Sequence, residues 1–238
     1  MPDRRTHRGK HPEDERLFAP SFYPVLREAV ADLSWLLSRG YSMTAGLKLV
    51  GDRYRLSARQ RMAVRRSACS DDSLARRRRS MFPLAAVEGR AVSVDGYNLL
   101  ITVESALAGG VLLIGRDGCY RDLASLHGTY RKVEETAPAL RLVRSALEEL
   151  GVTDVTWYLD RPVSNSGRLK AFIEETIGPA WKVELVDSPD AAVRNGDDLV
   201  ISSDSVVLDD CGAWINLAAY LVERSVERAW TVDLRPEG

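Results

Sequence analysis

The stretch VSVDGYN, residues 92–98, decides the fold. Val92 and Val94 are β-branched residues that favour a buried strand, and the Asp-Gly pair after them is typical of a strand end. Asp95 therefore lies at the carboxyl end of a predicted strand, and Asn98 opens the next helix at the same edge. Because ligands of α/β sheets bind outside the carboxyl ends of the strands, we expect both side chains to face a functional site.

The residues after this stretch repeat the same alternation. Short β-branched runs are separated by longer helical patterns, which predicts an α/β domain over residues 89–238 with a mostly parallel central sheet flanked by helices. The predicted strands span residues 91–95, 111–114, 154–159, 182–186, 198–202 and 229–234. The predicted helices span residues 99–108, 134–150, 166–177, 190–195 and 212–227. The strand at 111–114 precedes a turn, so it is either an antiparallel edge or part of an inserted hairpin.

The residues before this stretch are basic and helical. Residues 1–20 are a charged leader that we expect to pack loosely, residues 21–80 have the apolar spacing of a small helical domain, and residues 81–88 are a linker. Caps near Ser42 and Ser57 give the second and third helices a helix-turn-helix layout. Small bundles without nucleic-acid function share this layout, so a structural or partner-docking role is the alternative.

The net charge of −1 hides an asymmetry between the two halves of the chain. Residues 1–80 carry 18 Lys and Arg against 9 Asp and Glu, whereas the remaining residues carry 15 against 25. This asymmetry predicts that the first half meets a polyanion and that the second concentrates carboxylates. Alternatively, the two halves attract each other.

Several other classes of protein are disfavoured by composition. No apolar run approaches the ~20 residues of a membrane span, and the first residues lack the apolar core of a signal peptide, so we expect a cytoplasmic protein without a membrane partner. The three cysteines, Cys69, Cys119 and Cys211, have no CxxC spacing, which argues against a disulfide framework and a structural zinc site.

Carboxylates follow every strand predicted for the centre of the sheet. Asp95, Asp160 and Asp204 come directly after or close to strand ends, and Asp187 and Asp190 follow the strand at 182–186. Carboxylates gathered at one edge repel each other and are costly to desolvate, so such a cluster requires a cation such as Mg²⁺ or Mn²⁺. An ion held there would activate water for attack on a phosphodiester. The alternative is a set of separate caps and turn formers.

Four motifs along this region resemble those of an NYN domain, a PIN-like nuclease domain. They are VDGYNLL (94–100), LD followed by RPVSNSGRL (159–169), DSPDAAV (187–193) and DDLVISSDS (197–205). The resemblance covers roughly residues 89–234, and VDGYN is its most specific part. The whole chain, including RGKHPEDERLF (8–18) and LVGDRYRLSARQR (49–61), also resembles a two-domain prokaryotic family of unknown function.

The NYN resemblance implies a metal-dependent ribonuclease that uses Mg²⁺ or Mn²⁺. By its motifs, Asp95 would hold metal, Asn98 would orient a ligand or substrate phosphate, Asp204 would be the late strand-end acid and Asp190 would begin the preceding helix. Asp160 fits by position.

The late motif departs from the family pattern. A second acid commonly stands two residues after the late Asp, where this chain has Val206. Either Asp209 or Asp210 substitutes for it, or the site has fewer ligands and a weak affinity for metal.

Three groups of residues are predicted to contact phosphate or RNA. The first surrounds a helix N-terminus, where free N–H groups favour an anion: Arg161, Ser164, Asn165, Ser166 and Arg168. The second interleaves basic and aromatic residues: Arg116, Arg121, Arg131 and Lys132 with Tyr120, His127 and Tyr130. The third is the basic helix after Ser57: Arg59, Arg61, Arg65 and Arg66. The alternatives are a helix cap at Ser164 or Ser166, an ordinary insertion, and a structural bundle.

Three functional hypotheses follow from these patterns. The first is a metal-dependent ribonuclease in which Asp95, Asp160, Asp190 and Asp204 hold the ion and the basic helical domain recruits RNA. The second is a non-catalytic RNA- or nucleotide-binding protein of PIN-like shape, which the missing acid favours. The third is a helix-turn-helix regulator that binds DNA.

Overall fold

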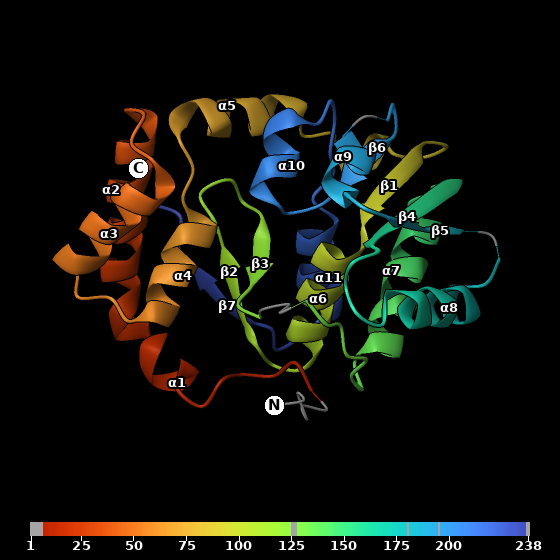
Figure 1. Ribbon diagram of the computed structural model, residues 1–238, viewed down its shortest axis with the longest axis horizontal. Helices are drawn as coiled ribbons and strands as arrows, with labels where there is room; N and C mark the ends of the chain where they lie inside the picture. The colour runs from red at the N-terminus through yellow and green to blue at the C-terminus, as the bar shows by residue number, and fades with distance from the viewer. Residues whose placement is uncertain (1–6, 125–127, 180, 195, 237–238) are drawn as a thin grey trace.

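A computed structural model describes residues 7–124, 128–179, 181–194 and 196–236 of the chain. Its centre consists of two separate sheets, and helices cover both of them (Figure 1). The α/β architecture with a helical N-terminal region agrees with the sequence prediction. Within the described part of the chain, no helix combines the length and apolar character that a bilayer span needs.

The larger sheet has four parallel strands in the order β5-β4-β1-β6. Its strands are β1 (Ala91–Asp95), β4 (Asp154–Asp160), β5 (Lys182–Val186) and β6 (Leu199–Ile201). Val94 pairs with Trp157 on one side and Ile201 on the other, which makes β1 a central strand. Because all four strands run in the same direction, their carboxyl ends meet at one edge.

Helices cover both faces of this sheet because its side chains are apolar on both sides. Trp157 and Leu159 of β4 face the main core, whereas the intervening Tyr158 packs against a second cluster around Trp214. The helices of this region are α6 (Gly96–Leu107), α7 (Thr136–Glu149), α8 (Ser166–Ile177), α9 (Pro189–Arg194), α10 (Ser205–Asp210) and α11 (Leu217–Ser225).

The smaller sheet corrects the predicted place of two strands. β2 (Val111–Ile114) pairs in parallel with β7 (Trp230–Asp233) and antiparallel with β3 (Tyr120–Asp122), so these strands form a sheet of their own outside the parallel one. Of the two alternatives for residues 111–114, the hairpin is the one found. Leu112 packs in the core around α6, while Val111 and Leu113 point to the opposite face, as strand alternation requires.

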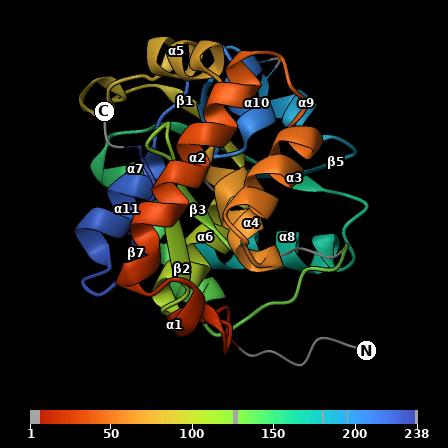
Figure 2. The same ribbon diagram turned by 90° about the vertical axis from the view of Figure 1, so that its left-hand side faces the viewer.

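N-terminal helices cover that opposite face, where α2 packs on β7 and α4 on β2 (Figure 2). They are α1 (Asp14–Leu17), α2 (Tyr23–Ser38), α3 (Met43–Arg53), α4 (Ala58–Ser67) and α5 (Asp71–Ser80), with short 3-10 helices at Pro20–Phe22 and Leu84–Ala86. Ser42 and Ser57 cap α3 and α4 as predicted, and Ser57 forms a capping box with Gln60. The helices and the smaller sheet share one hydrophobic core.

One N-terminal segment differs from the sequence expectation. The leader packs closely in its described part, because Phe18 is fully buried and the buried carboxylate of Asp14 pairs with Arg59. The arginine run 76–79 lies in α5, which packs against α10 (Figure 1).

Candidate functional site

Four strand-end carboxylates lie at the carboxyl edge of the larger sheet. Asp95 and Asp160 are the last residues of β1 and β4, Asp190 is in α9 after β5, and Asp204 follows β6 and precedes α10. The placement of Asp95 depends on Gly96, since a Cβ there would lie 2.8 Å from the Tyr158 carbonyl oxygen and 2.7 Å from Leu159 Cδ2. A glycine lets α6 begin directly against β4.

The four carboxylates affect one another electrostatically. Burial raises the pKa of Asp95 to about 7, with smaller contributions from the charges of Asp204 and Asp190. Burial also raises the pKa of Asp160 and of Asp190, with smaller contributions from Asp190 and Asp204 respectively. Asp95 is thus near enough to Asp204 and Asp190 for their charges to raise its pKa.

No cation neutralises this group within the described residues. None of the four carboxylates forms an ion pair with a described Lys, Arg or His, although Arg194 slightly offsets the charge of Asp190. Across the described ranges, no three Asp, Glu, His or Cys residues come together closely enough to hold a metal ion by themselves. Any ion at this edge would therefore take part of its coordination from water or substrate, as Mg²⁺ commonly does.

The capping alternative applies to Asp204 but not to Asp95. Asp204 Oδ1 accepts hydrogen bonds from the backbone N–H of Val206 (2.7 Å) and Val207 (3.4 Å), so it caps α10. Asp95 forms no cap and accepts instead from the Ser202 hydroxyl at 2.7 Å. Hydrogen bonds from Ser202 and from the backbone of Asn98 lower its pKa, but no described cation pairs with it.

Asn98 and Arg121 position the segment between β6 and α10. Asn98 Oδ1 accepts hydrogen bonds from both the N–H and the hydroxyl of Ser203, each at 2.8 Å. This oxygen is therefore occupied by Ser203 and is not open to a ligand. Arg121 Nε donates to the Ser203 carbonyl oxygen at 2.7 Å. Its other nitrogens pair with Asp117, which also pairs with Arg77 of α5. Arg121, which the sequence predicted to contact RNA, is almost fully buried, and its donors are engaged by Ser203 and Asp117.

Neither proposed substitute for the missing acid is free. Asp209 pairs with Arg77 and accepts from Ser73, and Asp210 pairs with Arg194. Val206 itself is 55% exposed beside Asp204.

Most arginines of the basic helix serve the fold. Arg59 pairs with Asp14, Arg61 with Asp52 and Arg66 with Asp122, whereas Arg65 is exposed without an ion pair to a described residue. Ala58 and Arg65 are the exposed residues of α4, and its other residues are buried or half-buried against the protein. The helix therefore offers little surface that could enter a DNA groove. Arg116 is likewise held by Asp71 and the Cys69 carbonyl oxygen.

The segment from β4 to α8 was predicted to hold a phosphate or to cap α8 through Ser164 or Ser166. Arg161 pairs with Asp187, and the Ser166 hydroxyl donates to the Arg161 carbonyl oxygen, so neither Ser164 nor Ser166 caps α8. Asn165 takes the cap position with φ 71° and donates to the Tyr130 carbonyl oxygen. The first turn of α8 thus has no side-chain cap. His127 lies outside the described residues.

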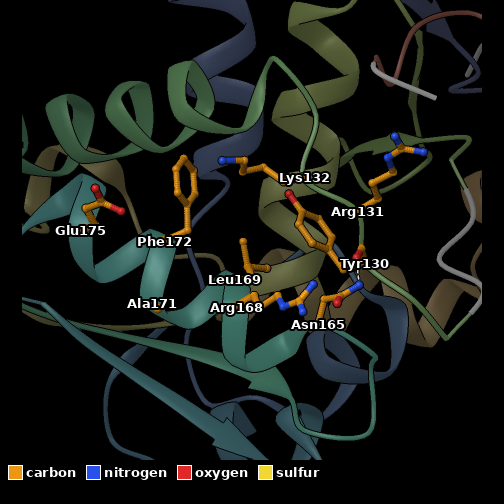
Figure 3. A pocket seen from close by; sticks show the side chains of 9 residues that line it. All are labelled: Tyr130, Arg131, Lys132, Asn165, Arg168, Leu169, Ala171, Phe172 and Glu175. Carbon is orange, nitrogen blue, oxygen red and sulfur yellow. Dashed lines mark hydrogen bonds between the residues drawn. The ribbon is translucent and has the colours of Figure 1, made fainter. Parts of the chain in front are cut away.

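A pocket of about 530 Å³ opens between α8 and the segment 130–132 (Figure 3). It contains the predicted residues Asn165 and Arg168 and also Phe172 and Glu175, which the sequence analysis missed. The signal for them is the three- and four-residue spacing from Asn165 along one face of the helix. The lining also includes Tyr130, Arg131 and Lys132 of the second predicted group, and the remaining residues are Leu169 and Ala171.

Comparison with known proteins gives a family for this fold and site. Residues 84–220 match the family described as a domain of unknown function, DUF5616. The chain belongs to the DUF5616 family. Residues 25–80 match a second family, the protein of unknown function DUF434, so the two matches meet near the predicted linker. The DUF5616 match includes all four strand-end carboxylates and the pocket.

One curated relative supports the membership. An uncharacterized protein of Methanocaldococcus jannaschii is 30% identical over 187 residues, which cover 77% of this chain and 88% of that protein. No solved structure gives a significant match. Neither family description names an activity.

Proposed function

We propose that the DUF5616 domain is a metal-dependent ribonuclease of the NYN type. The observation that carries the proposal is the group of four carboxylates that no described cation neutralises at the carboxyl edge of a parallel sheet. A buried carboxylate such as Asp95, whose pKa is about 7, is costly to ionise without a positive partner. The motif order shared with NYN domains supports the same assignment.

Asp95 and Asp204 would hold Mg²⁺ or Mn²⁺, with Asp160 and Asp190 beside them. When bound, the ion would lower the pKa of a coordinated water and stabilise charge on the phosphodiester. Hydrogen bonds within the protein would position the two metal ligands. The Ser202 hydroxyl orients Asp95, while Asn98 and Arg121 hold Ser203 next to Asp204. RNA phosphates would supply the ligands that the protein lacks at this edge.

The test is cleavage of a short single-stranded RNA by the full chain with Mn²⁺. We expect the wild type to cleave and the Asp95→Asn and Asp204→Asn variants to lose at least about a hundredfold in rate, since a metal ion contributes several kcal/mol to such reactions. Asp187→Asn is the matched control, because Asp187 lies after the same sheet edge but is 84% exposed and pairs with Arg161. Wild-type protein without Mn²⁺-dependent cleavage would refute the proposal.

A second candidate is an RNA-binding protein that does not cleave. The exposed Val206 at the position of the usual second acid favours it, as do the engaged carboxylates of Asp209 and Asp210. RNA binding that is unaffected by a chelator and by Asp95→Asn, without cleavage, would support this candidate over the first.

A further inference from the structure

The pocket beside α8 has the size and chemistry of a nucleotide site. Its volume of about 530 Å³ lies within the range of small-molecule pockets, roughly 300–1,000 Å³. The Phe172 ring forms part of the wall, and the ammonium group of Lys132 lies 4.0 Å from the ring centroid (Figure 3). An aromatic face that accepts a cation also accepts the flat face of a nucleobase.

The charges around the pocket are available to a ligand. Neither Arg168 nor Lys132 forms an ion pair with a described residue, in contrast to the engaged Arg59, Arg66 and Arg121. Arg168 is exposed on the first turn of α8, where no side chain caps the helix. Arg168 and Lys132 line the pocket together with one carboxylate, Glu175, so the cationic side chains favour an anion such as a phosphate.

Buried Tyr97 lies between the pocket wall and the acidic edge. The Tyr97 ring packs against Tyr130 of the pocket wall, with 5.4 Å between ring centroids. Burial and the charge of Asp160 raise the pKa of Tyr97, which places its hydroxyl group near that carboxylate. This hydroxyl is buried and has no hydrogen-bond partner among the described residues. Asn165, at the mouth of the pocket, comes only five residues after Asp160.

We propose that the pocket binds one unpaired nucleotide of single-stranded RNA, adjacent to the phosphodiester at the acidic edge. The base takes the place of the Lys132 ammonium group on the Phe172 ring, and the displaced Lys132 contacts the phosphate together with Arg168. The inference rests on the proposed function, since it takes RNA as the polymer. It adds a substrate class: a base held in the pocket cannot remain paired, so the protein prefers single strands to duplexes.

The test is equilibrium binding of a short 5′-fluorescein-labelled single-stranded RNA to the full chain in a chelator, measured by fluorescence anisotropy. Phe172→Ala should weaken binding at least about fivefold, the change expected for loss of base stacking, and Phe172→Tyr should restore most of it. Arg168→Ala should weaken binding and reduce the slope of log affinity against log salt by about 0.7. Circular dichroism checks that each variant is folded.

Lys170→Ala is the matched control, because Lys170 lies on α8 outside the pocket and is near Glu174. It should bind RNA within about twofold of the wild type, since the contact it loses is an exposed one. No RNA binding by the wild type, equal affinity for duplex RNA, or unchanged binding by both Phe172→Ala and Arg168→Ala would overturn the inference.

The outcomes separate this inference from the proposed function. Binding that depends on Phe172 and Arg168, without Mn²⁺-dependent cleavage, would refute only the ribonuclease. Cleavage that depends on Asp95 but is unaffected by both pocket substitutions would refute only the pocket.

Discussion

Replacement of Asp95 by Asn should stabilise the metal-free protein at neutral and alkaline pH. Asp95 is 8% exposed, and the described residues offer its carboxylate the Ser202 hydroxyl as a side-chain donor but no cation. Asparagine keeps the size of the side chain and an oxygen that accepts this hydrogen bond. The substitution therefore removes the buried charge and little else.

The magnitude follows from the pKa of Asp95, which is 3.8 in the unfolded chain and about 7 in the folded protein. The folded state holds the proton more tightly, so the free energy of unfolding of the wild type falls as pH rises from about 4 to about 7 and then stays level. The full loss is about 4 kcal/mol at about 1.4 kcal/mol per pKa unit. The gap between the Asn variant and the wild type should widen by about 3 kcal/mol between about pH 5 and about pH 8.

The assay is urea denaturation followed by circular dichroism, in a chelator, at both pH values. The difference in free energy of unfolding between variant and wild type is compared at the two pH values, so any pH-independent effect of the amide side chain cancels. Asp187→Asn is the control for removal of an exposed acid, and its gap to the wild type should change by less than about 0.5 kcal/mol. A gap for Asp95→Asn that does not grow with pH would refute the argument that this edge carries an uncompensated charge.

Four further predictions follow from the structure. Mn²⁺ affinity, measured by calorimetry, should fall about tenfold per unit as pH drops below about 7, because Asp95 must lose its proton to bind the ion; a flat profile would count against Asp95 as a ligand. Val206→Asp should raise Mn²⁺ affinity at least about fivefold by supplying the absent acid beside Asp204, and an unchanged affinity would argue against a site there. Phe18→Ala should lower the free energy of unfolding by about 3–5 kcal/mol, whereas a loosely packed leader would leave it unchanged. Arg121→Met should lower it by about 3–5 kcal/mol because it leaves Asp117 buried with one partner fewer, and a neutral effect would contradict the structural role.

Local patterns were sufficient to predict most of the elements. The β-branched residues of β1 and the helical spacing of α8 are properties of short windows, and Ser57 caps α4 through a hydrogen bond only three residues away. The edge position of Asp95 follows from strand direction alone, because parallel strands end together. These features need no knowledge of distant contacts.

The features that the sequence did not predict depend on distant contacts. β3 has three residues, two of them charged, and exists because Tyr120 to Asp122 pair with β2. Arg59 looks like a surface residue in sequence, and its buried partner Asp14 is 45 residues away. The role of Arg121 depends on Ser203, 82 residues further along the chain. The pocket likewise requires that Lys132 and Phe172 meet, which no single window contains.

A crystal structure grown with Mn²⁺ and a short single-stranded RNA tests the central claim most directly. Anomalous scattering locates the ion independently of the protein coordinates. We expect a Mn²⁺ peak in contact with Asp95 and at least one of Asp160, Asp190 and Asp204, with an RNA phosphate completing its coordination. An edge that carries no Mn²⁺ at millimolar concentration, with RNA bound elsewhere, would contradict it.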